Sequence, residues 1–341
     1  MSERTRVLVI AEAGVNHNGN LDMAKRLIDA AAHAGADLVK FQTFKAEKVA
    51  TGAAKKANYQ ARNEGAANDA ENDQVAMLKR LELSSEAHTM LMEHCAERNI
   101  GFFSTGFDLD SLDFLNGLGI PQFKIPSGEI TNLPYLRRVA SFGKETILST
   151  GMASMGEIEA AIEALEIAGL AREYITVLHC TTEYPAPFHE VNLHAMNTIR
   201  HAFGVRVGYS DHTQGIEVSL AAVALGAVVL EKHFTLDRTL PGPDHAASLE
   251  PDELAVLVQG IRRIEKALGR PEKRLTASEA SNVAVARKSI VASRRIRAGE
   301  VFSTENIAAK RPGNGLSPML WDQIIGRKAR RDFAIDELIE Y

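Results

Sequence analysis

The sequence contains little cysteine, no excess of basic residues and no long apolar run. Only two of its 341 residues are cysteine, Cys95 and Cys180. One falls in a helical pattern and the other in a strand pattern, so a disulfide scaffold is not expected and a reducing cytoplasm is the expected location. The net charge of −5 argues against a nucleic-acid partner, because such proteins are usually basic.

No segment has the pattern of a membrane or targeting element. No apolar run approaches the roughly 18 residues that a membrane helix needs, so no membrane partner is expected. The stretch Val7–Ile10 is too brief for the apolar core of a secretory signal. A hydrophobic content of 45% and a charged fraction of 24% are typical of an ordinary globular protein.

Eight short apolar runs recur along the chain, and each ends in a residue able to bind or catalyse. They are Val7–Glu12, Leu38–Gln42, Phe102–Thr105, Phe123–Ser127, Thr146–Ser149, Ile175–Thr181, Val205–His212 and Val228–His233. Helix-like stretches such as Leu21–Ala34 separate most of them. Alternating strand and helix signals predict an α/β protein with a parallel sheet, and eight such units predict a closed (β/α)8 TIM barrel.

A domain boundary is expected at Gly269. The helical pattern Glu250–Leu268 ends there, and Arg270–Arg274 is a charged connector that contains a proline. We therefore predict a barrel domain over residues 1–269, a linker over 270–284 and a small domain over 285–341. A loop-rich unit of about 55 residues is near the lower limit for independent stability, so it gains from docking on its own barrel or on a partner's.

The predicted strand ends gather polar side chains, and in TIM barrels the chemistry lies at those ends. The side chains are Glu12, Lys40, Gln42, Ser104, Lys124, Ser127, Glu129, Ser149, Thr182, Tyr184, Ser210, His212, Glu231 and His233. A chance arrangement would scatter such groups among strand starts, helices and loops. The pattern therefore predicts an enzyme.

Two lysines, Lys40 and Lys124, lie on strand runs that otherwise bury apolar side chains. A lysine inside a barrel is costly without an anionic partner. Two kinds of partner are open: a bound phosphate and carboxylate, or the glutamates at similar depth, which are Glu12, Glu129 and Glu231. Anion binding is favoured because serines add hydroxyl donors that ion pairing does not require; these are Ser127, Ser149 and Ser210.

Two histidines, His212 and His233, end the seventh and eighth runs, and Glu12 on the first strand lies beside them in a closed barrel. Two neutral imidazoles, with or without a carboxylate, suit a divalent transition metal. Manganese is the expected ion, with magnesium or cobalt as alternatives. A lone histidine is usually packed or hydrogen-bonded, but two on neighbouring strand ends favour metal binding. His17, in the first loop, stays open between a site role and a packing role.

The stretch Gly52–Gln74 is rich in Ala, Asn, Asp and Glu and has no clean periodicity. It follows the second predicted strand and is too long for an ordinary turn between a strand and a helix. Two interpretations of this stretch stay open: a lid over the site and a mobile solvated loop.

Several strings in this order resemble the sialic acid synthase family. They are AEAGVNHNG (11–19), VKFQTF (39–44), KIPSGE (124–129), LSTGM (148–152), TEYPAP (182–187), SDH (210–212), EKHFTLD (231–237) and GPDH (242–245). KRPGNG (310–315) resembles the loop of that family's carboxyl-terminal domain, which is similar to type III antifreeze protein and is called the SAF domain. Each string is modestly specific, whereas the ordered set covers nearly the whole chain and is very specific.

The resemblance implies a transferase that joins phosphoenolpyruvate to an N-acylated mannosamine-type sugar and releases phosphate. It assigns phosphoenolpyruvate to Lys40, Lys124, Ser127, Ser149, Thr182 and Ser210, and the metal to His212 and His233. It assigns the sugar to Gln42, Glu129, Tyr184, Asp244 and Arg311. Glu12 or Glu129 would position water or move the proton, and the choice stays open. It also implies a domain-swapped homodimer in which Arg311 reaches the partner's site.

The identity of the sugar depends on a short stretch. CTTEYPAPF together with AEAGVNHNG is more similar to legionaminic acid synthases, which use 2,4-diacetamido-2,4,6-trideoxymannose. Neuraminate synthesis from N-acetylmannosamine and pseudaminate synthesis remain open. A heptulosonate-type barrel synthase would share the lysines and the metal site but would be expected to lack the small domain. A protein that only binds ice or glycans would need none of the strand-end groups, and Lys310 and Arg311 suit a flat apolar face poorly.

Overall fold

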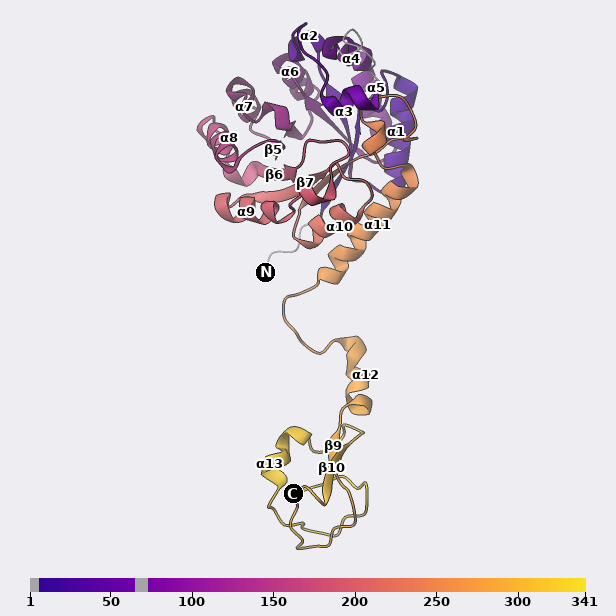
Figure 1. Cartoon of the computed structure of the whole chain (residues 1–341), viewed down its shortest axis with the longest axis vertical. Helices are drawn as coiled ribbons and strands as arrows, with labels where there is room; N and C mark the ends of the chain where they lie inside the picture. Colours follow the sequence, from indigo (N-terminus) through magenta and orange to yellow (C-terminus); the bar gives the residue numbers. More distant parts are fainter. Residues whose placement is uncertain (1–5, 65–72) are drawn as a thin grey trace. The chain divides into compact units, whose positions relative to one another are not determined.

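The computed structural model describes residues 6–64 and 73–341 and divides into two compact units, Met1–Gly269 and Arg270–Tyr341 (Figure 1). Each unit is described by itself. Residues 65–72, which belong to the stretch considered as a lid, lie outside the described residues. Within the described part of the chain, no helix is both long and apolar enough to cross a membrane.

The first unit is built on an eight-stranded parallel sheet that curls into a nearly closed barrel. Its strands are β1 (Leu8–Gly14), β2 (Leu38–Thr43), β3 (Gly101–Gly106), β4 (Gln122–Ile125), β5 (Glu145–Ser149), β6 (Ile175–Cys180), β7 (Arg206–Asp211) and β8 (Val229–His233). The ladder runs β3-β2-β1-β8-β7-β6-β5-β4, so its two ends are strands that follow one another in sequence. The predicted barrel is confirmed.

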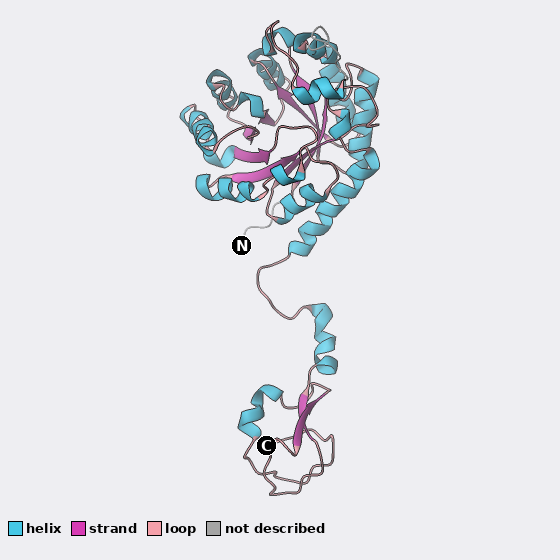
Figure 2. Cartoon of the chain, viewed as in Figure 1, coloured by secondary structure: helices cyan, strands magenta, loops and turns pink. Residues whose placement is uncertain are grey.

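Helices surround the strands, as Figure 2 shows. They are α1 (Leu21–Ala34), α2 (Ala46–Val49), α3 (Asn58–Asn63), α4 (Gln74–Leu81), α5 (Ser85–Glu97), α6 (Leu109–Gly117), α7 (Leu133–Ala140), α8 (Met155–Ile167), α9 (His194–Phe203), α10 (Glu217–Ala224) and α11 (Pro251–Leu268). α1 illustrates the pattern, since Leu27, Ile28 and Ala31 are buried on one face. Asn20 caps its start and Gly35 ends it in the left-handed conformation, with φ 81°.

The inside of the barrel has an apolar layer below a polar layer. The apolar layer is Ile10, Phe103, Ile147, Leu178 and Val229. Two residues further along their strands stand Glu12, Thr105, Ser149, Cys180 and Glu231. Because side chains alternate along a strand, residues two apart point to the same side. The sheet therefore packs its lower interior with hydrocarbon and presents functional groups at its carboxyl end.

Two predicted strand details are wrong. Phe123–Ser127 was expected to be extended, but β4 ends at Ile125 and Ser127 lies in the short 3-10 helix η1 (Ser127–Glu129). Pro126 has no N–H to continue the ladder, so the strand stops before it. Ser104 was expected at the functional end of β3, but its hydroxyl bonds to that of Thr43 at 2.7 Å, and Thr105 lines the cavity instead. Alternation from the inward Phe103 explains the difference.

The second unit contains α12 (Ala277–Ala286), the antiparallel pair β9 (Ser289–Ala292) and β10 (Ile307–Lys310), and the short helix α13 (Trp321–Ile324). Its core includes Ile290, Ile296, Phe302, Ile324 and Phe333. Much of α12 occupies the segment for which a linker was expected. A capping box formed by Thr276 and Glu279 begins that helix and is the sequence signal for it.

Candidate active site

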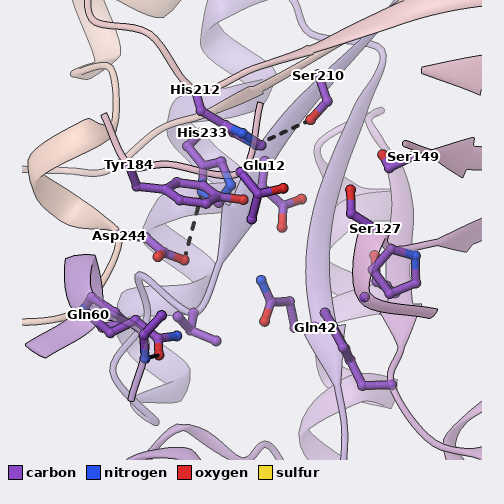
Figure 3. Close-up of a pocket in the computed structure, with 18 of the residues that line it drawn as sticks. Glu12, Gln42, Gln60, Ser127, Ser149, Tyr184, Ser210, His212, His233 and Asp244 are labelled. Carbon is purple, nitrogen blue, oxygen red and sulfur yellow. Dashed lines mark hydrogen bonds and ion pairs between the residues drawn. The ribbon is translucent and has the colours of Figure 1, made fainter. Parts of the chain in front are cut away.

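A cavity of about 430 Å³ opens at the carboxyl ends of the barrel strands. Its walls contain the barrel residues predicted for the site: Glu12, Lys40, Gln42, Lys124, Ser127, Glu129, Ser149, Thr182, Tyr184, Ser210, His212, His233 and Asp244. Figure 3 labels ten of the lining residues, nine of them from this set, and Gln60 is the tenth. Arg311 belongs to the second unit and is exposed there. The structure therefore gathers around one space every residue of the first unit that was predicted to bind substrate or metal or to take part in catalysis.

Two lysines and two glutamates form the floor of the cavity. Lys40 Nζ lies 2.7 Å from Glu12 Oε2 and 3.5 Å from Glu231 Oε2. Lys124 Nζ lies 3.2 Å from Glu231 Oε1. Glu129 is not their partner, because its carboxylate accepts a hydrogen bond from Asn132 at 2.6 Å. Both lysines are therefore paired with glutamates, which was one of the two kinds of partner left open by the sequence. Both ammonium groups still line the cavity.

The two floor carboxylates have opposite acid–base properties. Burial raises the pKa of Glu12 to about 7, although the Lys40 ammonium acts against that rise. Burial acts on Glu231 in the same sense, but Lys124 and Lys40 outweigh it and hold its pKa well below the usual range. Glu231 therefore remains ionised near neutral pH. Glu12 is the floor carboxylate that can take up or release a proton there.

Hydroxyl groups line the side of the cavity beside Lys124. Ser149 Oγ and Thr182 Oγ1 are buried and have no hydrogen-bond partner among the described residues. Ser127 Oγ accepts a bond from the Gly151 N–H at 2.9 Å. A Cβ at Gly151 would lie 2.0 Å from Thr182 Oγ1, so only glycine lets this loop come so close. Unpaired buried hydroxyls are costly, and a ligand with acceptor oxygens would satisfy them.

The two histidines lie side by side, with ring centroids 5.5 Å apart. His212 Nδ1 contacts the Thr181 carbonyl oxygen at 2.6 Å and must be the donor, which leaves the lone pair on Nε2. His233 Nδ1 has no hydrogen bond in the described structure and lies 3.9 Å from Asp244 Oδ2. Burial lowers the pKa of His212 to about 4 and that of His233 well below its usual value. Both rings are therefore neutral at pH 7.

This pair fits a divalent metal ion as a two-histidine set. Neutral imidazoles are metal ligands, and a backbone carbonyl that holds the far nitrogen of His212 is a common supporting contact. Among residues 6–64 and 73–341, no group of three or more His, Cys, Asp or Glu side chains is assembled for a metal. Substrate or water would therefore have to supply the remaining ligands.

A buried ion pair lies behind the histidines and was missed in the sequence. Asp211 and Lys232 pair across β7 and β8, and Lys232 Nζ lies 3.1 Å from Asp211 Oδ2 with both side chains fully buried. The other Asp211 oxygen accepts two bonds from Thr213, each 2.8 Å. The signal was present, because each residue of the pair directly precedes a site histidine and alternation turns it away from the cavity.

Helix α3 contributes residues that the sequence did not indicate. Tyr59 and Gln60 line the cavity, and the ring of Tyr59 lies 4.6 Å from that of Tyr184. Tyr184 in turn lies 4.1 Å from the ring of His212. The stretch around α3 has no clean periodicity, so no pattern in the sequence pointed these side chains toward the strand ends.

The barrel and its polar carboxyl end are the architecture of a TIM-barrel enzyme. Comparison with known proteins identifies the family. The NeuB family matches residues 27–273 and the SAF domain matches residues 287–341. The chain belongs to the NeuB family and carries a SAF domain.

Individual relatives cover nearly the whole chain. It is 55% identical to an N,N'-diacetyllegionaminic acid synthase of Campylobacter jejuni, over 98% of this chain and 99% of that one. It is 47% identical to an enzyme of the same name from Legionella pneumophila, over 94% and 89%. A solved N-acetylneuraminic acid synthetase from Leptospira borgpetersenii superposes with a TM-score of 0.71 at 38% identity, covering 82% of this chain and 91% of that one. The predicted family is confirmed.

Proposed function

We propose that this protein condenses phosphoenolpyruvate with 2,4-diacetamido-2,4,6-trideoxymannose and releases phosphate, forming N,N'-diacetyllegionaminic acid. The relatives at 55% and 47% identity bear the name of that product. The observation that carries the reaction type is the division of the cavity. One side holds Ser127 and the unpaired Ser149 hydroxyl, the other side holds Tyr184 and Asp244 (Figure 3), and the lysine ammonium groups lie in the floor. Neuraminate and pseudaminate synthesis are the alternatives within the family.

The lysines and hydroxyls suit phosphoenolpyruvate. Its phosphate and carboxylate would be held by Lys40 and Lys124 together with the hydroxyls of Ser127, Ser149, Thr182 and Ser210. Charged hydrogen bonds in a water-poor cavity are strong, and the positions of the lysines are already fixed by Glu12 and Glu231. The Ser149 and Thr182 hydroxyls would gain the acceptor that they lack.

Other lining residues suit an uncharged sugar. Gln42 offers an amide, Tyr184 offers a ring, and Glu129 and Asp244 offer acceptors for sugar hydroxyl and amide hydrogens. Burial raises the pKa of Asp244 to about 7, with Glu64 adding to the rise. The Asp244 carboxyl can therefore donate or accept near neutral pH. Figure 3 shows Tyr184 and Asp244 apart from Ser127 and Ser149.

His212 and His233 would hold the divalent ion, with manganese as the proposed metal and magnesium or cobalt as alternatives. When bound, such an ion draws electron density from the sugar aldehyde and stabilises the alkoxide. The two neutral rings contribute lone pairs, and the Thr181 carbonyl fixes the orientation of His212. Tyr184 packs against both rings.

The reaction needs one proton transfer that a carboxylate can serve. Carbon 3 of phosphoenolpyruvate attacks the aldehyde carbon, and water adds to carbon 2. The carbon–oxygen bond to phosphate then breaks as carbon 2 becomes a carbonyl, and the proton of its hydroxyl leaves with the phosphate. Glu12, with its pKa near 7, can take a proton from that water and return it to the new alkoxide. Glu129, whose pKa burial also raises, is the alternative.

The SAF domain would complete the site of a second subunit in a domain-swapped homodimer. Arg311 is exposed, and its Nε donates to the Ala286 carbonyl at 3.1 Å, which holds the guanidinium at the start of the 311–315 loop. A guanidinium offers a planar set of donors to an acetamido carbonyl. We place the protein in the cytoplasm, because both cysteines are free and buried.

Subunit exchange tests the shared site. Arg311→Ala and His212→Ala proteins should each be nearly inactive. If Arg311 serves the partner, the mixed dimer has one site with both lesions and one intact site, so about a quarter of wild-type activity returns after random exchange. If exchange is demonstrated by labelled subunits and no activity returns, Arg311 serves its own chain.

Phosphate release tests the reaction itself. The protein, manganese and phosphoenolpyruvate are mixed with 2,4-diacetamido-2,4,6-trideoxymannose, with N-acetylmannosamine or with no sugar. The diacetamido sugar should give the highest kcat/KM, and phosphate should appear in step with a nine-carbon 2-keto acid. Phosphate release without sugar, or no release with any member of the panel, would contradict the proposal.

A further inference from the structure

Helix α3 is joined to two loops that carry site residues. Arg62 Nη2 donates to Glu183 Oε1 at 3.1 Å and to the Tyr184 carbonyl at 3.2 Å, both in the loop after β6. Asn63 Nδ2 donates to the Pro243 carbonyl at 2.7 Å, in the loop that precedes Asp244. Although α3 has only six residues, it is thus tied by three side-chain hydrogen bonds to the side of the cavity that holds Tyr184 and Asp244.

The same helix turns an aromatic ring toward the site. Tyr59 is half-buried and lines the cavity, and its ring lies 4.6 Å from Tyr184 at an interplanar angle of 30°. Tyr184 lies 4.1 Å from His212 at 33°. The three rings form a continuous wall that runs from α3 to the histidine pair. Gln60, the next residue of α3, is drawn near Asp244 in Figure 3, on the side away from Ser149.

We propose that Tyr59 is a specificity-determining residue, and that its ring, with that of Tyr184, packs against a substituent of the amino sugar. The inference rests on the proposed function. The two candidate sugars differ at carbon 4, which carries an acetamido group or a hydroxyl, and at carbon 6, which is a methyl or a hydroxymethyl group. A planar amide and a methyl group pack well on aromatic rings, whereas a hydroxyl gains little from them. The described wall of Tyr59, Tyr184 and His212 contains no lysine, so the wall offers no positive charge to the phosphate of phosphoenolpyruvate.

The test compares Tyr59→Ala and Tyr59→Phe with wild type. Tyr59→Ala should raise the KM for the sugar about tenfold and change the KM for phosphoenolpyruvate less than about twofold, because one apolar contact is worth roughly 10- to 200-fold in discrimination. Its preference for the diacetamido sugar over N-acetylmannosamine, as a ratio of kcat/KM, should fall by a similar factor. Tyr59→Phe keeps the ring and should restore both values.

Tyr174→Ala is the matched control. Tyr174 is 42% exposed and does not line the cavity, so this variant should behave as wild type. If thermal unfolding shows that Tyr59→Ala does not fold, Tyr59→Leu takes its place, since it removes the ring and keeps apolar bulk.

Three results would overturn the inference. They are an unchanged sugar KM and preference, an equal rise in KM for both substrates, and a loss in Tyr59→Phe as large as in Tyr59→Ala. If wild type itself prefers N-acetylmannosamine, the proposed sugar is wrong. The comparison of sugar KM with phosphoenolpyruvate KM still decides the role of Tyr59 in that case, because it can be made with whichever sugar the enzyme uses.

Discussion

The barrel unit and the small unit bury different kinds of side chain. The barrel buries charged groups at and behind its cavity: Glu12, Lys40, Lys124, Asp211, Glu231 and Lys232. In residues 270–341, all of which are described, the buried polar residues are the uncharged Ser289 and Asn306. Burying charge carries a desolvation cost that pairing only partly offsets. The barrel therefore sacrifices stability at its active end, while the small unit has an aliphatic and aromatic core without that cost.

Net charge separates the units as well. Residues 270–341 contain 14 Lys or Arg and 9 Asp or Glu, a net charge of +5, which leaves −10 for the barrel unit. The small unit carries its positive charge at the surface, where solvent screens it. The barrel lysines are fewer but act inside a cavity, where the effect of each charge is much larger.

The largest expected effect is on the two histidines. His212→Ala or His233→Ala should lower kcat by about 10³-fold or more, because several kcal/mol of transition-state stabilisation are lost. The far-ultraviolet circular dichroism should stay unchanged, because these residues line a cavity and are not part of the apolar core. Full activity in either variant, or in wild type after exhaustive chelation, would remove the metal assignment.

Removing a floor lysine should have the next largest effect. Lys40→Met or Lys124→Met should raise the KM for phosphoenolpyruvate about 100-fold, since truncating one partner of a buried charge pair costs about 2–5 kcal/mol. The KM for the sugar should change little. Steady-state kinetics with each substrate varied in turn measures both. A change confined to the sugar would mean that the lysines bind the other ligand.

A buried and an exposed ion pair test the contrast directly. Lys232→Met leaves Asp211 buried without its cation and should lower the free energy of unfolding of the barrel by about 3 kcal/mol. Arg295→Ala removes a pair in the small unit whose side chains are 77% and 56% exposed, and no measurable change is expected. Circular dichroism follows the barrel helices, and the single tryptophan, Trp321, reports on the small unit. Equal losses would mean that burial does not distinguish these pairs.

Acid should destabilise the barrel unit more than the small unit, because His17 lies in the barrel. This is the smallest of the predicted effects. Burial, with His88 and His245 nearby, lowers its pKa to about 4, and its Nδ1 accepts the Gly19 N–H. The unfolded chain binds a proton near pH 6.5 but the folded one does not, so stability present above pH 6.5 is lost toward pH 4. The loss is about 3 kcal/mol at most. Residues 270–341 contain no histidine.

The measurement compares wild type with His17→Asn, whose amide oxygen can replace Nδ1. The free energy of unfolding of the barrel is measured at pH 7 and at pH 4.5. Its decrease between the two should be smaller in the variant than in wild type. The Trp321 signal of the small unit serves as the internal reference. Parallel pH dependence in the two proteins would show that His17 does not titrate in this way.

Much of the barrel and its site could be read from local pattern. Each predicted run is short and ends in a polar residue, and helix-like stretches separate most of the runs. The alternation of side chains places Glu12, Ser149 and Glu231 above an apolar layer. These properties depend on residues two to four apart, so they are visible along the chain. The ordered motifs indicate the family for the same reason, because each motif is a run of neighbouring residues.

Pairing and environment depend on residues far apart. No local pattern assigns Glu231 to both lysines or brings Tyr59 against Tyr184. Nor does it show that burial leaves Glu12 able to titrate near pH 7 while Glu231 stays ionised. Such properties arise from distances and desolvation that exist only when the strand ends converge. For that reason, the types of functional group follow from the residues, whereas their partners and protonation follow from the closed barrel.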